Sequence, residues 1–370
     1  MRGALAPEEE AFRAEVRAFL ADWRDVDGYL RMGSRWERVT ELWRAMGARG
    51  WLSLAWPEAH GGAGRPPGFE FVLWDEAAYA RAARAPLDGG IVAKSLLRAG
   101  SDAQRARWLP GIRRGDTWFS LGYSEPEAGS DLAAVRTRAE RQGDVYVVSG
   151  EKCWTSYAER SAWLWTLVRT GPPDSRADGL SLLIVDLRAP GVTVEPLPTL
   201  DGEQLNAIRL DGVRVPVEQR VGPEHGAWKL MADALADERH VQFPPGRLRR
   251  DLDDLVGWVS ARGRSGDVEV RGRLAELAVR VAECEAHALR VLDAMQRGRS
   301  GAIEAAANKV AHTETAQALA AAALDLGGPE ALLSGSPWER LWRQSLWETI
   351  GGGTSEILRG VVARHALGLR

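Results

Sequence analysis

The sequence has few cysteines, no long apolar run and no excess of one charge, and each shortage excludes a class of protein. Two cysteines, Cys153 and Cys284, are too few for a disulfide framework or a thiolate metal cluster, so we expect no metal site. No stretch reaches the eighteen or so uncharged apolar residues that span a membrane, and the N-terminus does not read as a secretory signal. We therefore expect a cytoplasmic protein with no membrane partner.

Two further absences concern nucleic acids and nucleotides. The 48 basic and 51 acidic residues are intermixed and give a net charge of -3, so no basic face for nucleic acid is expected. No GxGxxG follows a strand-like run, which excludes dinucleotide binding in the Rossmann manner. The composition is that of a globular protein. Its 370 residues, 45% of them hydrophobic, suffice for two or three packed layers or domains.

Hydrophobic periodicity divides the chain into helices, strands and helices again. Residues 1–116 and 223–370 have apolar positions three and four apart, whereas residues 117–222 consist of short strand-like runs separated by Gly, Pro, Asp and Ser. The pattern does not alternate strand with helix, so a doubly wound parallel sheet is not expected. We predict an α+β protein with an N-terminal α-helical domain, a central β-domain and a C-terminal α-helical domain at these bounds.

The segment SEPEAGSD (Ser124 to Asp131) opens the β-region with a loop rich in polar groups. Gly129 permits close approach of a ligand, and Ser124, Ser130 and the loop N–H groups can donate to a phosphate or a flavin edge. The spacing alone favours a turn whose polar side chains cap the neighbouring backbone.

Three later segments also combine groups that suit a ligand. In GEKCWTSYA, Trp154 and Ser156 occupy alternate strand positions and can face one flat ligand, although Trp154 also suits a core. In LADERHVQF, Glu238 and Arg239 end a helix before Pro244, where such a pair is commonly a solvated ion pair. In IGGGTSEILRG, glycines precede Thr354 and a helix N-terminus, which favours an anion.

Taken in order, these segments resemble the acyl-CoA dehydrogenase family over essentially the whole chain. The resemblance extends to AWPEAHGG and RWLPGIRRGD in the N-terminal third, and it is similar to a bacterial subgroup with a GGGTSEI ending. It implies an N-terminal helical domain, a small central β-barrel or sheet domain, and a C-terminal four-helix bundle. It also implies bound FAD, an acyl-CoA substrate, an electron-transferring flavoprotein as electron acceptor, and a homotetramer or dimer.

The resemblance assigns roles to individual residues. Ser130 and Arg239 match substrate-side positions, and Thr354 and Glu356 match positions that reach the pyrophosphate and adenosine of FAD. The full set of implied cofactor-binding residues is Tyr123, Ser124, Gly129, Ser130, Trp154, Ser156, Gly353, Thr354 and Glu356.

The expected catalytic base is Glu238. Dehydrogenation needs a base for the proton α to the thioester, and a carboxylate in an apolar pocket has its pKa raised toward working pH. Many family members carry this base directly before the terminal Gly-Thr, where this chain has Gly352. Other members carry it at the helix position that Glu238 matches.

Two departures from the family pattern bear on partners. The segment Val259 to Leu274 has no Phe-Gly pair, and Leu324 stands where members often carry a glutamine. In those members the Phe-Gly pair and the glutamine reach the FAD of a neighbouring subunit. The resemblance therefore leaves open a heterotetramer with a related chain, in which this subunit has little activity alone. A flavin oxidase or hydroxylase of the same fold, and a carrier-protein thioester as substrate, also stay open.

Overall fold

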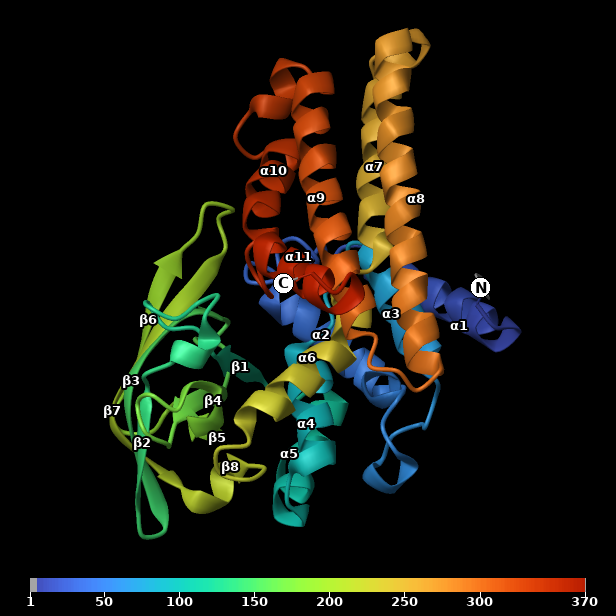
Figure 1. The fold of residues 1–370 in the computed structure, drawn as a ribbon. Helices are drawn as coiled ribbons and strands as arrows, with labels where there is room; N and C mark the ends of the chain where they lie inside the picture. Colours follow the sequence, from blue (N-terminus) through green and yellow to red (C-terminus); the bar gives the residue numbers. More distant parts are fainter. Residues whose placement is uncertain (1–4, 370) are drawn as a thin grey trace. The chain divides into compact units, whose positions relative to one another are not determined.

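The computed structural model describes residues 5–369, except for the side chains of residues 236, 237 and 239. Within this range the elements run in the order α1–α5, β1–β8 and α6–α11 (Figure 1). The predicted order of helices, sheet and helices is thus confirmed. The chain forms two compact units, which are described separately below. The sheet unit comprises Thr40–Gly64 and Ala85–Glu238; the helical unit comprises the chain up to Val39, Arg65–Arg84 and the chain from Arg239 onward.

The sheet unit is built on one mixed sheet. Its strand order is β6-β7-β3-β2-β4-β5-β8, and β1 pairs in parallel with β4 off this path. The strands are β1 (Phe119–Gly122), β2 (Arg138–Gln142), β3 (Val145–Ser156), β4 (Trp163–Arg169), β5 (Leu180–Asp186), β6 (Val192–Pro198), β7 (Gln204–Pro216) and β8 (Arg220–Val221).

Alternating side chains of β4 and β5 enter two hydrophobic cores on opposite faces of the sheet. Trp165 and Leu182 join the core with α4 (Ala93–Ala99), α5 (Asp102–Arg114) and the first part of α6 (Ala227–Gln242). Leu164 and Leu183 join the second core, with residues of β3 and β7. Because both faces are covered, these two strands are mostly apolar, interrupted by Thr166 and Ser181, and do not alternate apolar with polar residues.

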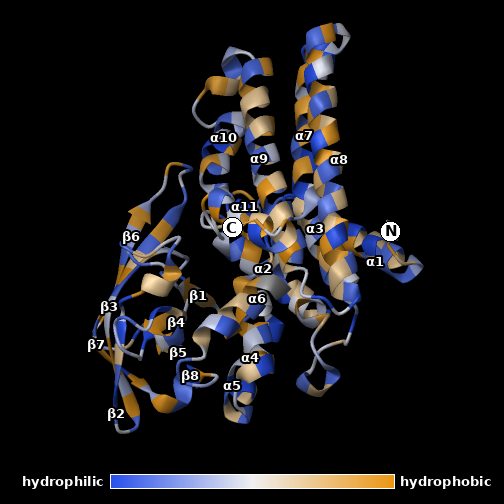
Figure 2. Ribbon diagram, in the orientation of Figure 1, coloured by the Kyte–Doolittle hydropathy of each residue, from blue (hydrophilic) through white to orange (hydrophobic). Residues whose placement is uncertain are grey.

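The helical unit contains a bundle of four long helices. They are α7 (Pro245–Ala261), α8 (Val268–Gln296), α9 (Ala302–Leu326) and α10 (Pro337–Glu348), followed by α11 (Ser355–Ala366). Hydrophilic and hydrophobic residues are interspersed along α7 and α8, as amphipathic helices require (Figure 2). Many of the inward positions of α9 are alanines, which let neighbouring helices approach closely.

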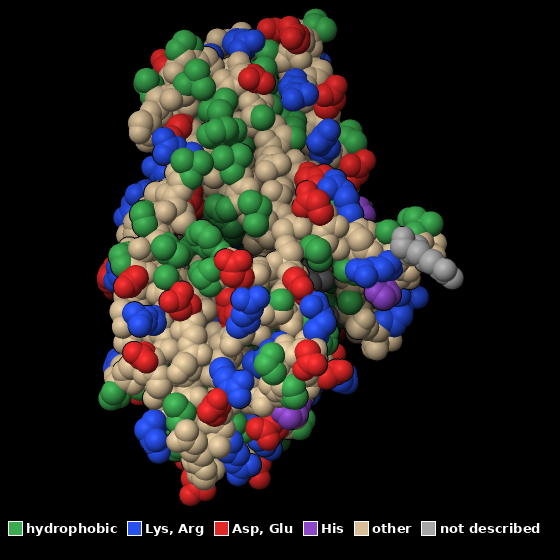
Figure 3. Space-filling model, turned by 60° about the vertical axis from the view of Figure 1, so that its left-hand side comes forward, with side chains coloured by type: hydrophobic (Ala, Val, Ile, Leu, Met, Phe, Trp, Pro, Cys, Tyr) green, Lys and Arg blue, Asp and Glu red, His purple; other side chains and the backbone are tan. Residues whose placement is uncertain are grey.

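The remaining helices precede the sheet. They are α1 (Pro7–Leu20), α2 (Trp36–Ala48) and α3 (Pro67–Tyr79), and in the helical unit the buried Glu76 of α3 pairs with Arg17 at 2.8 Å. Apolar side chains remain exposed on either side of α10 in the sequence, among them Leu332, Leu333 and Ile350. Figure 3 shows hydrophobic side chains (green) on the surface in its upper part. None of the helices described is long and apolar enough to cross a membrane.

Candidate active site

A buried ion pair fixes the SEPEAGSD loop to β3. The Glu125 carboxylate accepts hydrogen bonds from Lys152 Nζ at 2.8 Å and from the backbone N–H groups of Arg136 and Thr137 at 2.7 and 2.8 Å. Lys152 Nζ also donates to the carbonyl of Tyr123 at 3.2 Å. These hydrogen bonds fix the first residues of the loop to β3 and to the backbone of residues 136 and 137.

The two charges of this pair shift each other's proton affinity. Burial acts to raise the pKa of Glu125, but the Lys152 ammonium and the N–H donors outweigh it and hold that pKa below its usual range. Burial lowers the pKa of Lys152 to about 8, against the opposing pull of Glu125. Both groups are nearly inaccessible to solvent, and the pair ties the loop to β3.

The outer end of the loop is open to a ligand. Gly129 and Ser130 are exposed, and no atom lies within 4 Å of the place that a Cβ on Gly129 would occupy. Mutual backbone hydrogen bonds of 3.0 Å between Glu125 and Ala128 close the turn beneath them. Nearer the core, the Ser124 carbonyl accepts from the N–H of Cys153 at 3.0 Å, which joins the loop to the strand that carries Trp154.

Trp154 occupies a strained backbone position at a β-bulge. The register of β3 with β7 shifts between Lys152 and Thr155, and Trp154 has a φ of 59°. The bulge interrupts the regular pairing just before Trp154, and burial still alternates from Cys153 to Ser156, so a shared face for Trp154 and Ser156 stays a prediction. Trp154 is 62% exposed, whereas Ser156 is half-buried.

Strain of this kind in a bulky residue is typical of a ligand-binding position. A left-handed backbone costs about 1–3 kcal/mol at a non-glycine residue and persists where function needs it. Because the indole of Trp154 is exposed rather than packed, it offers a flat apolar surface to a heteroaromatic ring.

The strain leads to an unusual expectation for Trp154→Gly. Glycine tolerates this φ, so we expect the free energy of unfolding of the cofactor-free protein to rise by about 1 kcal/mol. At the same time we expect weaker flavin retention, because the ring surface is lost. Thermal unfolding of the cofactor-free protein and flavin content after gel filtration measure the two effects. A variant that loses stability and keeps its flavin would contradict both expectations.

Glu238 is a fully buried carboxylate near the start of the SEPEAGSD loop. It lies on α6 with none of its surface exposed, and its Cγ, Cδ and Oε1 atoms lie against Gly90. Burial, together with the charge of Glu238, raises the pKa of the Tyr123 hydroxyl, which accepts a hydrogen bond from Trp165 Nε1 at 3.0 Å. Within the sheet unit, Glu238 is therefore close enough to Tyr123 for its charge to affect the hydroxyl. The side chain of Arg239 lies outside the described residues.

Asp88 begins the short π-helix that contains Gly90 (Asp88–Val92). Its Oδ1 accepts from the N–H of Phe119 at 2.6 Å, and burial raises its pKa to about 8. The folded state therefore keeps a proton on Asp88 between about pH 4 and pH 8 that the unfolded chain has already released. The free energy of unfolding therefore falls as the pH rises through that window, because unfolding releases the proton.

We expect Asp88→Asn to remove this pH dependence. The amide keeps an acceptor for Phe119 but cannot ionise, so the variant should gain stability relative to the parent as pH rises from 5 to 8. The limit is about 1.4 kcal/mol for each pH unit. Urea unfolding at both pH values measures the difference, with exposed Asp174→Asn as control. An equal difference between variant and parent at both pH values would refute the buried, protonated state.

A second group of predicted residues lies in the helical unit. Gly352 and Gly353 have φ values of 71° and 92°, and Thr354 caps α11 by accepting from the N–H of Ile357 at 3.2 Å. Lys309 Nζ donates to the carbonyl of Gly353 at 2.8 Å. Glycine backbone, a helix N-terminus and a buried ammonium together favour an anion.

Glu356 is an exposed carboxylate in the first turn of α11. Hydrogen bonds from its own N–H and from Thr354 lower its pKa. A carboxylate at this place suits sugar hydroxyls better than phosphate oxygens.

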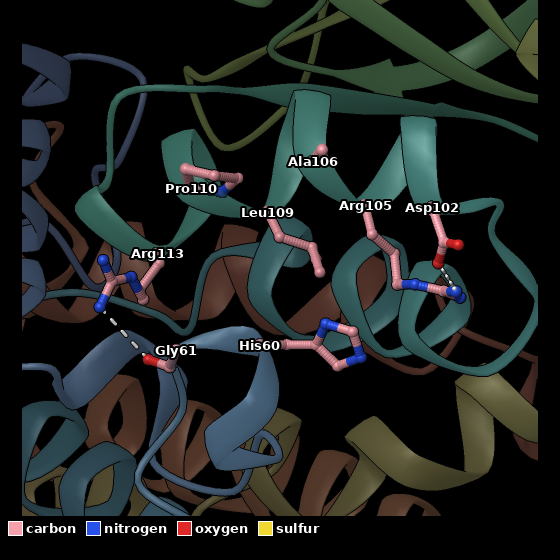
Figure 4. A pocket seen from close by; sticks show the side chains of 8 residues that line it. All are labelled: His60, Gly61, Asp102, Arg105, Ala106, Leu109, Pro110 and Arg113. Atoms are coloured by element: carbon pink, nitrogen blue, oxygen red, sulfur yellow. Dashed lines mark hydrogen bonds and ion pairs between the residues drawn. The ribbon is translucent and has the colours of Figure 1, made fainter.

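Two surface pockets of the sheet unit differ from the predicted site. One of about 370 Å³ lies between His60–Gly61 and α5, where Arg113 Nη1 donates to the Gly61 carbonyl at 3.3 Å (Figure 4). It contains none of the predicted residues. The other, about 310 Å³, lies behind the SEPEAGSD loop and includes Glu125, Glu127 and Glu151. Three carboxylates and one basic residue, Arg136, line it, so acidic groups predominate.

Sequence reasoning missed three residues that shape the site. They are Asp88, Gly90 and Lys152. A glycine pair inside a helical pattern was a usable signal for the second, because glycine there normally destabilises the helix unless close packing requires it. A lysine within a strand gave a weaker signal.

Three family models match the chain in consecutive order. The model described as the acyl-CoA dehydrogenase N-terminal domain matches residues 6–116, the middle-domain model matches residues 120–213, and the C-terminal-domain model matches residues 225–367.

Individual relatives match along the full length. Acyl-CoA dehydrogenase FadE26 of Mycobacterium tuberculosis is 35% identical over 399 residues, covering 100% of this chain and 99% of that protein. The solved Tcur3481-Tcur3483 steroid ACAD has 32% identity and a TM-score of 0.92, with 100% of both chains covered. The ChsE4-ChsE5 complex from Mycobacterium tuberculosis has 35% identity and a TM-score of 0.90, again with 100% of both chains covered.

Proposed function

Because this chain belongs to the acyl-CoA dehydrogenase family, we propose that it introduces an α,β double bond into an acyl-CoA thioester with Glu238 as the base. The observation that carries the proposal is the fully buried Glu238 carboxylate, adjacent to Gly90 and close enough to Tyr123 to act on its hydroxyl. Gly352, by contrast, leaves the terminal loop without a carboxylate at the alternative base position.

The chain is an FAD-dependent oxidoreductase, and its residues fit that cofactor. The exposed, strained Trp154 suits a flavin ring, and the glycine turn before Thr354 suits a pyrophosphate. FAD, when bound, supplies the acceptor for the hydride that leaves the β-carbon. We assign its binding to Tyr123, Ser124, Gly129, Ser130, Trp154, Ser156, Gly353, Thr354 and Glu356.

The chain's own contribution is proton transfer, orientation and exclusion of water. Glu238 takes the α-proton onto its carboxylate, which is fully buried. We assign to Ser130 and the loop N–H groups the donation of hydrogen bonds to the thioester side of the substrate, which would stabilise charge developing on the carbonyl oxygen. Arg239 completes the proposed substrate contacts.

We further propose that the chain works in a heteromer with a related subunit and acts on a steroid-type acyl group. The support is that one similar solved structure is a steroid ACAD and that another is the ChsE4-ChsE5 complex. Leu324 and the lack of a Phe-Gly pair in Val259 to Leu274 agree with a partner that supplies part of the FAD site. We propose an electron-transferring flavoprotein as the acceptor of the electrons.

The test is an anaerobic titration with short, long, branched and steroid-type acyl-CoAs while the visible flavin absorbance is followed. We expect only the steroid-type thioester to bleach the flavin. A colourless chain that gains flavin and activity after co-expression with a related subunit would support the heteromer, whereas full flavin content and turnover alone would refute it. Rapid reoxidation of the reduced flavin by dioxygen would favour an oxidase instead.

A further inference from the structure

The carboxylate of Glu238 lies against a residue that has no side chain. A Cβ built on Gly90 would be 2.6 Å from Glu238 Cγ and 2.8 Å from both Cδ and Oε1. Contacts between carbon atoms are favourable at about 3.5–4.0 Å, so a methyl group fits only if the Glu238 side chain shifts. Because Glu238 is fully buried, its side chain cannot relieve the contact by moving into solvent.

The backbone at Gly90 is itself held firmly. Gly90 is the central residue of the π-helix Asp88–Val92, a rare element that often marks a functional site. Asp88 ties its first turn to β1 through the N–H of Phe119, and Ile91 and Val92 are buried in the hydrophobic core. A substitution at Gly90 must therefore be accommodated mainly by the Glu238 side chain.

We infer that Gly90 is a positioning residue for proton transfer: the bare backbone of the π-helix sets where the Glu238 carboxylate lies. The inference rests on the proposed role of Glu238 as base. Proton transfer requires the base within hydrogen-bond reach of the group that gives up the proton, about 2.6–3.2 Å between heavy atoms. A misplacement of about 1 Å can lower the rate roughly 100-fold. Gly90 thus acts through Glu238 and not on the substrate itself.

The adjacent Gly89 provides a matched control. A Cβ on Gly89 would meet only the Leu52 carbonyl, at an ordinary 3.7 Å, and Gly89 belongs to the same π-helix. We expect Gly90→Ala to lower the limiting rate of flavin reduction by about 10- to 100-fold, with KM changed less than about threefold and the pH–rate profile shifted. Gly89→Ala should stay within about twofold of the parent. Equal losses in the two variants, or an unchanged rate in Gly90→Ala, would overturn the inference.

A double-variant comparison tests the contact without catalysis. Alanine normally stabilises a helix relative to glycine, by roughly 1 kcal/mol. Gly90→Ala should nevertheless lower the thermal midpoint of the parent, whereas in the Glu238→Ala background, where the clashing atoms are gone, it should be neutral or raise it. The same decrease in both backgrounds would refute the contact with Glu238.

The two proposals fail in different ways. Retained flavin reduction in Glu238→Gln would sink the assignment of the base but leave the stability coupling between positions 90 and 238 intact. If Glu238→Gln loses flavin reduction but the effects of Gly90→Ala and Glu238→Ala on the thermal midpoint are additive, only the role of Gly90 is refuted. If Gly90→Ala does not fold, folding of the Glu238→Ala, Gly90→Ala double variant supports the contact, and its failure contradicts it.

Discussion

Glu238→Gln should lower the rate of flavin reduction by at least about 1,000-fold while the flavin stays bound. The amide has nearly the volume of the carboxylate, so the packing against Gly90 is kept, but it cannot accept the α-proton. Anaerobic stopped-flow absorbance with a reactive acyl-CoA gives the rate, and the visible spectrum before mixing gives the flavin content.

Asp233→Asn on the same helix is the control for this variant. Asp233 is partly exposed and pairs with Lys229 at 3.0 Å, one turn away along α6. Its loss should change the reduction rate less than about twofold, because a surface pair contributes roughly 0–1 kcal/mol. Equal rates in Glu238→Gln and the parent would remove Glu238 from the mechanism.

Lys152→Met should destabilise the protein by about 3–5 kcal/mol and release the flavin. The substitution leaves the Glu125 carboxylate buried with two N–H donors but without the ammonium that it pairs with, which is the costly way to break a buried pair. Because Lys152 also bonds the carbonyl of Tyr123, the loop that we assign to the flavin loses its support. Urea unfolding and flavin content after gel filtration measure both effects.

The second substitution Glu125→Gln separates the charge from the packing. Added to Lys152→Met, it removes the unpaired charge, so part of the lost stability should return. Lys229→Met, which breaks an exposed pair instead, should cost less than about 1 kcal/mol. A loss in Lys152→Met no larger than that of Lys229→Met would show that the buried pair does not hold the loop.

The predictable part of the fold is the part where local pattern and burial agree. β5 is apolar except for Ser181 and its last residue, Asp186, and it is buried as far as Val185, so composition identifies it. β2 reads RAERQ, and only Ala139 of its five residues is buried. Its pairing with β3 makes it a strand, and pairing between distant residues leaves no local signal.

Buried charges were equally beyond local prediction. Arg247 is 1% exposed and pairs with Asp251 at 2.7 Å and with Glu348 at 2.8 Å, the latter from another helix of the bundle. Charged residues at such positions normally indicate a solvated helix face, and only the tertiary packing supplies their partners.

The candidate site shows the same division. The segments around Ser124 and Thr354 could be found because ordered motifs resemble a family. The bulge at Trp154 and the contact of Gly90 with Glu238 could not, because both depend on the register or packing of elements far apart in the sequence. The roles of the individual site residues remain predictions until the variants are measured.

The most direct test of the account is to count flavin reduced against product formed in one anaerobic turnover. An acyl-CoA that bleaches the flavin is mixed with the protein, or with its heteromer, and the thioester is analysed by mass spectrometry. The account predicts one enoyl thioester, lighter by two hydrogens, for each flavin reduced. Bleaching with an unchanged thioester, or a product that has gained oxygen, would contradict α,β-dehydrogenation.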